Sequence, residues 1–169
     1  MASSNNGTFL EGDALMTLVR ERTQAGQSIR YLPFRGVSML PMLRQGKDQV
    51  ELSPLPPRLK KYDLPVYQMP SGKYVMHRVV ADKGNYYLCN GDNLYTFERV
   101  PHAHMIALVT AFTRNGRRIE VTSSAYRAYC VFWHYTRPLR HLYRRTRATV
   151  GRLIKNHIQV LRGKENGEV

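Results

Sequence analysis

The chain has 169 residues, of which 43% are hydrophobic and 22% are charged. This length and composition are typical of one globular domain with short appendages, and they exclude an intrinsically disordered chain. The two cysteines, Cys89 and Cys130, have neither the density of a disulfide scaffold nor the spacing of zinc ligands, which indicates a reducing compartment.

The net charge of +14 is concentrated toward the C-terminus. Residues 126–169 carry 10 Lys or Arg against 2 Asp or Glu, whereas residues 1–125 carry 16 against 10. A basic segment of this kind indicates an anionic partner, either membrane lipid or nucleic acid.

The sequence predicts neither a signal peptide nor a membrane-spanning helix. The first seven residues are polar, and charged residues interrupt the apolar positions that follow. A transmembrane helix needs about 20 predominantly apolar residues. We therefore expect a cytoplasmic protein, either free or peripheral at the inner face of the membrane.

The first predicted element is a short amphipathic helix over residues 9–24, because apolar residues there recur at helical spacing. It is expected to end at Ala25-Gly26, since glycine suits the position after a helix, and to pack its apolar side on the domain. Residues 1–27 are thus predicted to be a tail followed by this helix.

Residues 28–122 predict a compact β domain, because short β-branched and aromatic runs alternate with turns and no helical pattern intervenes. Pro65 marks one run as an edge strand, since proline lacks the N–H that a strand ladder uses. Hairpin turns are predicted at residues 82–85 and 114–117. The predicted strands cover residues 31–34, 50–52, 64–67, 74–80, 86–89, 106–112 and 118–121.

Residues 123–169 predict a basic helical extension with a disordered tail. Residues 126–133 are apolar and aromatic but too few to span a bilayer, and Pro138 suits the first turn of a helix. This composition is typical of a helix that lies in the plane of a membrane surface; the alternative is a helix whose apolar face covers the β core. Apolar residues fall near one face (Leu142, Val150, Leu153, Ile154, Ile158, Leu161), and basic residues lie largely off it (Arg140, Arg144, Arg147, Lys155, Arg162).

Three polar residues stand where a β domain can gather them. Ser38 follows the first predicted strand, His77 lies within an apolar strand, and Asp92 comes just after the next strand. A serine hydroxyl attacks only when a base takes its proton, and a carboxylate behind an imidazole fixes the tautomer of that base. The alternatives are a turn serine, a core histidine and a turn aspartate that bonds its own backbone.

Four sequence blocks, in this order, resemble those of the signal peptidases and the LexA-type self-cleaving repressors. Gly36-Val37-Ser38-Met39-Leu40-Pro41 is similar to a nucleophile box usually written G-x-S-M-x-P. Residues 60–67 resemble the strand G-D-I-V-V-Y, residues 76–80 the box that carries the general base, and residues 91–93 the box K-G-D-N. The resemblance covers residues 31–112 and implies a compact β core of the LexA and signal peptidase type.

The resemblance also implies a serine endopeptidase that cleaves an extended peptide, with small side chains beside the cut bond, and needs no cofactor or metal. Because position 77 is histidine, the chain resembles the Ser–His subgroup, in which Ser38 is the nucleophile and His77 the base. Asp92 is then expected to orient His77, with Glu98 as an additional acidic support. The backbone N–H of Ser38 is expected to stabilise the oxyanion, and the expected substrate contacts are Gly36, Val37, Met39 and Pro41.

The chain departs from the family pattern at two positions and lacks the usual N-terminal membrane anchor. Gly46-Lys47-Asp48 has one residue more than the usual Gly-Asp, and Tyr62 stands at a family glycine. The expected substrate is therefore an intracellular precursor peptide.

Two other functions remain open from the sequence. One is a non-catalytic module that binds an anionic membrane surface or a peptide through residues 126–162; no motif predicts specific nucleic-acid recognition. The other is LexA-type self-cleavage at Ala25-Gly26.

Overall fold

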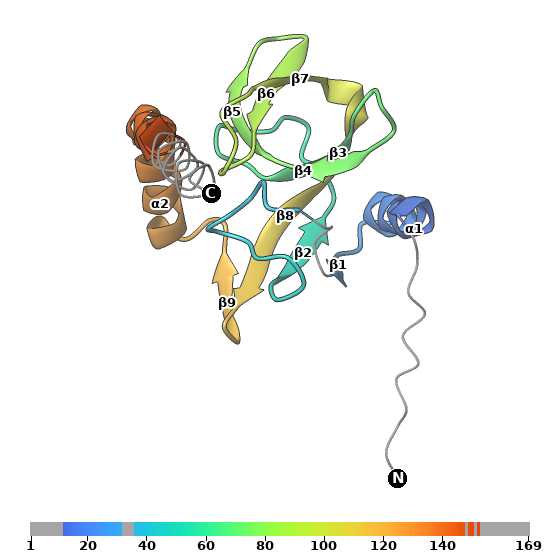
Figure 1. The fold of residues 1–169 in the computed structure, drawn as a ribbon. Coiled ribbons are helices and arrows are strands. Elements are labelled where there is room, and N and C mark those ends of the chain that lie inside the picture. The colour runs from blue at the N-terminus through green and yellow to red at the C-terminus, as the bar shows by residue number, and fades with distance from the viewer. Residues whose placement is uncertain (1–11, 32–35, 148, 151, 153–169) are drawn as a thin grey trace, which may run out of the picture. The chain divides into compact units, whose positions relative to one another are not determined.

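The computed structural model describes residues 12–31, 36–147, 149–150 and 152 (Figure 1). They fall into two compact units that divide between Cys130 and Val131. The first unit contains two antiparallel sheets. Over the described residues, helix and strand contribute about equally, so the chain is mixed α and β around an antiparallel core rather than mainly β.

The N-terminal helix α1 spans Gly12–Gln24, and residues 1–11 of the expected helix and tail lie outside the described residues. The helix ends as predicted, because Gly26 adopts a φ of 75° and the N–H of Gln27 donates to the carbonyl of Arg22 at 2.9 Å. This is the glycine-terminated pattern common at helix C-termini. The apolar side of α1 packs on the larger sheet, against β1, β2 and β8.

The larger sheet has the strand order β1-β2-β8-β3-β4, and β9 pairs with β8. The predicted edge position of the strand at residues 64–67 is wrong, because β3 lies between β8 and β4. Pro65 is tolerated there as the first residue of its strand, where proline is acceptable in a sheet. The strands are β1 (Ile29–Tyr31), β2 (Gln49–Ser53), β3 (Pro65–Gln68), β4 (Tyr74–Met76), β8 (Met105–Arg114) and β9 (Arg117–Glu120).

The smaller sheet has the order β5-β6-β7, formed by Arg78–Asp82, Tyr86–Asn90 and Glu98–Pro101, and a short 3-10 helix η1 (His102–His104) follows it. The single strand predicted over residues 74–80 is in fact two strands that belong to different sheets. The chain passes from one sheet to the other at His77. The strand β7 was not predicted from the sequence.

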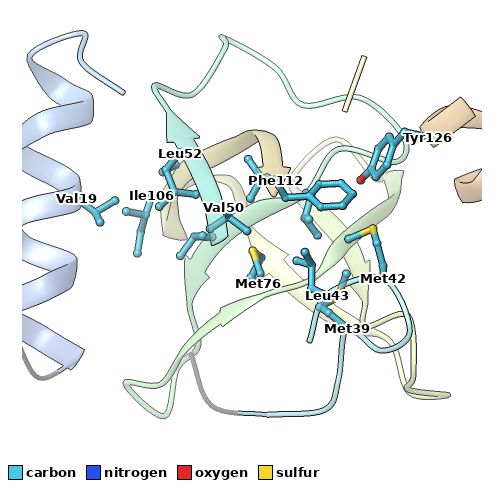
Figure 2. Packing of buried hydrophobic residues seen from close by; sticks show 14 of the residues in the cluster. Val19, Met39, Met42, Leu43, Val50, Leu52, Met76, Ile106, Phe112 and Tyr126 are labelled. Carbon is cyan, nitrogen blue, oxygen red and sulfur yellow. The ribbon is translucent and has the colours of Figure 1, made fainter. Parts of the chain in front are cut away.

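The main hydrophobic core lies between α1, the larger sheet and the segment that carries Ser38. Figure 2 shows Val19 of α1, Val50 of β2 and Phe112 of β8 in this cluster, together with Met39 and Met42 from that segment. A second cluster, which includes Tyr67, Val79 and Cys89, fills the space against the smaller sheet. The residues around Ser38 are thus anchored by burial of their apolar neighbours.

Helix α2 spans Ser124–Tyr135, and Ser123 caps it by accepting the N–H of Tyr126 at 3.4 Å. Residues 137–147 form a further helix with Pro138 in its first turn, as predicted. The predicted apolar positions from Leu153 onward and the expected disordered tail lie outside the described residues. No helix of the described chain is long and apolar enough to cross a membrane.

Candidate active site

Ser38 lies in a turn, and its neighbours fix that turn in place. The structure shows residues 37–42 as turn rather than as the end of a strand, and of the strand expected at residues 31–34 only Tyr31 is described. Gly36 adopts a φ of 145°, in the region of positive φ that favours glycine. The side chains of Met39 and Met42 are buried, at 5% and 2% exposure, so the chain on the C-terminal side of Ser38 is held by the core (Figure 2).

Residues 36–48, which we call the serine loop, are closed by an ion pair at their C-terminal end. Asp48 is fully buried and accepts hydrogen bonds from the backbone N–H of Arg44 at 2.8 Å and from its guanidinium group. Although burial acts to raise the pKa of Asp48, these hydrogen bonds lower it overall. Gly46, at a φ of 67°, makes the turn between the two partners. The extra residue of Gly46-Lys47-Asp48 is thus accommodated by a tight turn.

Residues 91–94, which we call the clamp loop, hold the serine loop from the other side. The backbone N–H of Asn93 donates to the carbonyl of Ser38 at 2.8 Å, and the Asn93 side-chain amide donates to the carbonyl of Val37 at 3.0 Å. These two hydrogen bonds join segments more than fifty residues apart in sequence. They fix the backbone position of Ser38.

Gly91 provides the close approach between the clamp loop, Ser38 and His77. A Cβ atom added at Gly91 would lie 2.8 Å from the carbonyl oxygen of Ser38 and 3.1 Å from Nε2 of His77. Because both atoms are close to this one point, Nε2 of His77 lies near the backbone of Ser38. Only glycine leaves room for this arrangement.

The other side of the His77 ring contacts a partly buried carboxylate and a buried tyrosine. Nδ1 of His77 lies 2.8 Å from Oε2 of Glu98 and 3.2 Å from the hydroxyl of Tyr67, which also donates to Glu98. The His77 side chain is 4% exposed and that of Glu98 21%. Tyr67 is fully buried.

The charge state of Glu98 decides which ring nitrogen of His77 carries the proton. Burial acts to raise the pKa of Glu98, but hydrogen bonds with His77 and Tyr67 lower it overall, so the group is an ionised acceptor at neutral pH. Burial and the bond to Glu98 raise the pKa of Tyr67, which stays a donor. An ionised carboxylate only accepts, so Nδ1 of neutral His77 holds the proton and Nε2 is free to take one.

Asp92 does not occupy the orienting position that the sequence predicted for it. Its carboxylate forms a two-pronged ion pair with Arg78, with Nε–Oδ1 at 2.9 Å and Nη2–Oδ2 at 2.7 Å. Arg78 pairs with Asn90 in the β5–β6 ladder, which brings Asp92 next to Arg78. The carboxylate that contacts His77 is Glu98, at the start of β7, so the predicted contact between Asp92 and His77 is corrected.

Arg78 ties the site to the beginning of helix α2. Its guanidinium group is buried and donates to the hydroxyl of Tyr126 at 2.8 Å and to the sulfur of Cys130 at 2.9 Å, both on α2. It also donates to the carbonyl of Tyr62 at 3.2 Å. Tyr62 adopts a φ of 79°, a left-handed conformation that favours glycine.

The sequence did not predict Tyr67 or Arg78 as residues of the candidate site. A signal for Arg78 existed, because a charged residue within the apolar run at residues 75–80 requires a buried partner, and Asp92 was available. Tyr67 stands at the tyrosine of the block G-D-I-V-V-Y, but its contacts with His77 and Glu98 depend on the pairing of distant strands, which the local sequence does not indicate.

The expected substrate contacts divide between exposed and buried positions. Gly36, Val37 and Pro41 are exposed, with Val37 at 59%. The expectation for the side chain of Met39 is corrected, because it is buried in the core and supports the loop from beneath. The backbone N–H of Ser38 donates to no described residue and is available to a bound group.

The two cysteines are unsuited to act as nucleophiles. Burial raises the pKa of the Cys89 thiol to about 12 and also raises that of Cys130, so neither thiol supplies a thiolate near neutral pH. Within the described part of the chain, no group of three His, Cys, Asp or Glu side chains is placed to hold a metal ion.

Comparison with known proteins gives no relative for this chain. No protein-family model, no curated protein and no solved structure matches it. The case for its function therefore rests on the motifs and on the geometry of these side chains.

Proposed function

We propose that this chain is a serine endopeptidase of the signal peptidase and LexA type, with Ser38 as nucleophile, His77 as general base and Glu98 as the carboxylate that orients His77. One observation carries the proposal: Nδ1 of His77 is held by the partly buried carboxylate of Glu98, and Nε2 lies near the backbone of Ser38. A base oriented from behind and aimed at a serine is the arrangement that nucleophilic catalysis requires.

In the first step, Oγ of Ser38 attacks the carbonyl carbon of the scissile peptide bond while Nε2 of His77 takes the hydroxyl proton. The described hydrogen-bond partners of the His77 ring are Tyr67 and Glu98, both at Nδ1, and a bond between a nucleophile and Nε2 commonly tightens only when substrate binds. The negative charge on the carbonyl oxygen is stabilised by the backbone N–H of Ser38. Protonated His77 then gives its proton to the leaving amine, and an ester on Ser38 remains.

In the second step, His77 takes a proton from water, and the resulting hydroxide attacks the ester carbon. Collapse of the second tetrahedral intermediate releases the new carboxylate and returns the proton to Ser38. Ionised Glu98 stabilises the imidazolium of His77 in both steps and is itself unchanged.

The substrate class is an extended peptide. Strand β4 ends directly before His77 and stands last in its sheet, with β3 as its hydrogen-bonded neighbour in the described chain. An extended peptide that adds to this edge would pass beside His77 and Ser38. A preference for small side chains at the cleavage site follows from the family resemblance alone.

A peptide-library experiment tests the proposal. The full chain is incubated with extended peptides of varied sequence, and cleavage products are identified by mass spectrometry for the wild type, Ser38→Ala and a matched control, Ser71→Ala. Ser71 is an exposed turn serine and is none of the candidate residues. We expect cleavage by the wild type and by Ser71→Ala only. Equal cleavage by Ser38→Ala overturns the proposal.

A further inference from the structure

The second unit of the chain carries an exposed apolar face on helical residues. Phe132 and Tyr135 of α2 are 62% and 66% exposed, and Leu139, Tyr143 and Val150 in the following helical residues are 67%, 63% and 52% exposed. Spacings of three, four and seven residues place such side chains on one side of a helix with 3.6 residues per turn. A helix in water does not gain stability by exposing an apolar row of this kind, which indicates a binding surface.

The same segment is basic and carries no acidic residue. Residues 131–152 contain six arginines and no Asp or Glu. Arg137 and Arg144 fall on the side of the helix away from Leu139, and Arg140 and Arg147 lie at the border between the two sides. Arg140 lies over the ring of Trp133, with 3.6 Å between its guanidinium carbon and the ring centroid. The segment therefore combines an apolar face with a strongly cationic one.

We propose that residues 131–152 bind the surface of an anionic membrane, with the Leu139 face inserted among the acyl chains and the arginines at the level of the lipid phosphates. The charge of the segment indicates a membrane as the partner, because an apolar row flanked by cations fits a bilayer that is apolar inside and anionic at its surface. The phosphates of a nucleic acid would attract the arginines but would not bury the apolar side chains. None of residues 131–152 belongs to the candidate active site, and their binding is measured without any cleavage assay.

Vesicle sedimentation of the full chain tests the proposal with two substitutions that introduce the same residue on different faces of the helix. Leu139→Asn and His141→Asn place the same residue two positions apart, which on a helix means nearly opposite sides. With vesicles of phosphatidylcholine and phosphatidylglycerol, we expect Leu139→Asn to lower the partition coefficient about tenfold, because a leucine is no longer buried. His141→Asn should bind as the wild type does. Equal binding by all three proteins overturns the proposal.

Substitution of an arginine tests the electrostatic part of the proposed binding independently. Arg147→Gln should weaken binding to the anionic vesicles about fivefold and leave the weak binding to pure phosphatidylcholine vesicles unchanged. Equally strong binding of the wild type to both kinds of vesicle contradicts the anionic surface. Binding to poly(U) RNA without binding to vesicles contradicts the membrane and favours nucleic acid.

A fluorescence measurement keeps the proposal testable even if Leu139→Asn disturbs the helix. The chain has a single tryptophan, Trp133, so a Trp133→Phe background accepts one reporter at a chosen position. With anionic vesicles, Leu139→Trp should shift its emission to the blue and be protected from iodide, while His141→Trp should stay accessible. The same response from both positions overturns the proposed orientation, and no response from either overturns the binding.

Discussion

Nδ1 of His77 lies 2.8 Å from Oε2 of Glu98, across 21 positions of sequence and between two different strand ends. This contact gives His77 a fixed tautomer and leaves Nε2, which lies near the backbone of Ser38, without the proton. The two carboxylates of the site have different partners. Glu98 contacts the imidazole of His77, and Asp92 neutralises the guanidinium group of Arg78.

The first prediction concerns Glu98. In Glu98→Gln the side chain keeps its shape but loses its charge, so the imidazolium of His77 is no longer stabilised. We expect kcat for peptide cleavage to fall by about 100- to 10,000-fold with little change in KM. Steady-state kinetics on a peptide cleaved by the wild type measure this. Wild-type kcat in Glu98→Gln would remove Glu98 from the mechanism.

The second prediction concerns Asp92. Asp92→Asn leaves the buried guanidinium of Arg78 without its counter-charge, and the free energy of unfolding should fall by about 3–5 kcal/mol. Urea denaturation followed by circular dichroism measures this. An Asp92→Asn protein as stable as the wild type but inactive would instead give Asp92 the catalytic role that the sequence first indicated.

The third prediction is a pH dependence of stability. The folded pKa of Glu98 lies below its usual value of 4.5, despite the opposing effect of burial, because His77 and Tyr67 hydrogen-bond to the ionised form. A carboxyl group with a depressed pKa contributes stability above its unfolded pKa and loses it as the pH falls through the folded pKa. Below about pH 4.5, the free energy of unfolding should therefore decrease less steeply with acid in Glu98→Gln than in the wild type.

Denaturation at a series of pH values measures this slope. Asp48 also has a lowered pKa, so some acid dependence remains in the Glu98→Gln protein. Parallel curves for the two proteins would mean that Glu98 has the same pKa in the folded and unfolded states.

The fourth prediction concerns Gly91. A Cβ at this position meets the backbone oxygen of Ser38 at 2.8 Å, closer than packed atoms tolerate, so Ser38 and His77 must move apart. Gly91→Ala should lower kcat/KM by at least about 100-fold, because small misplacements of reacting groups are costly. Gly12→Ala is the matched control, since a Cβ there meets nothing within 4 Å. Equal activity of both variants would contradict the close approach.

The sequence predicted the parts of the site that depend on local pattern. Ser38 and His77 were identified from their motifs, and the β5–β6 and β8–β9 hairpins were predicted from their turns. The division of residues 74–80 into two strands was not predicted, because an uninterrupted apolar run gives no sign of a change of sheet. The pairing of Glu98 with His77 depends on the β6–β7 register, in which Cys89 lies opposite Glu98, and local sequence does not encode that register.

The most direct test of the proposed mechanism is a search for the ester intermediate on Ser38. The wild-type chain is mixed with a cleaved peptide, quenched in acid within the first turnover, digested and analysed by mass spectrometry. We expect the N-terminal fragment of the substrate to be attached to Ser38 in the wild type and to be absent in His77→Ala. Cleavage that proceeds without this adduct and is undiminished in Ser38→Ala would contradict the mechanism.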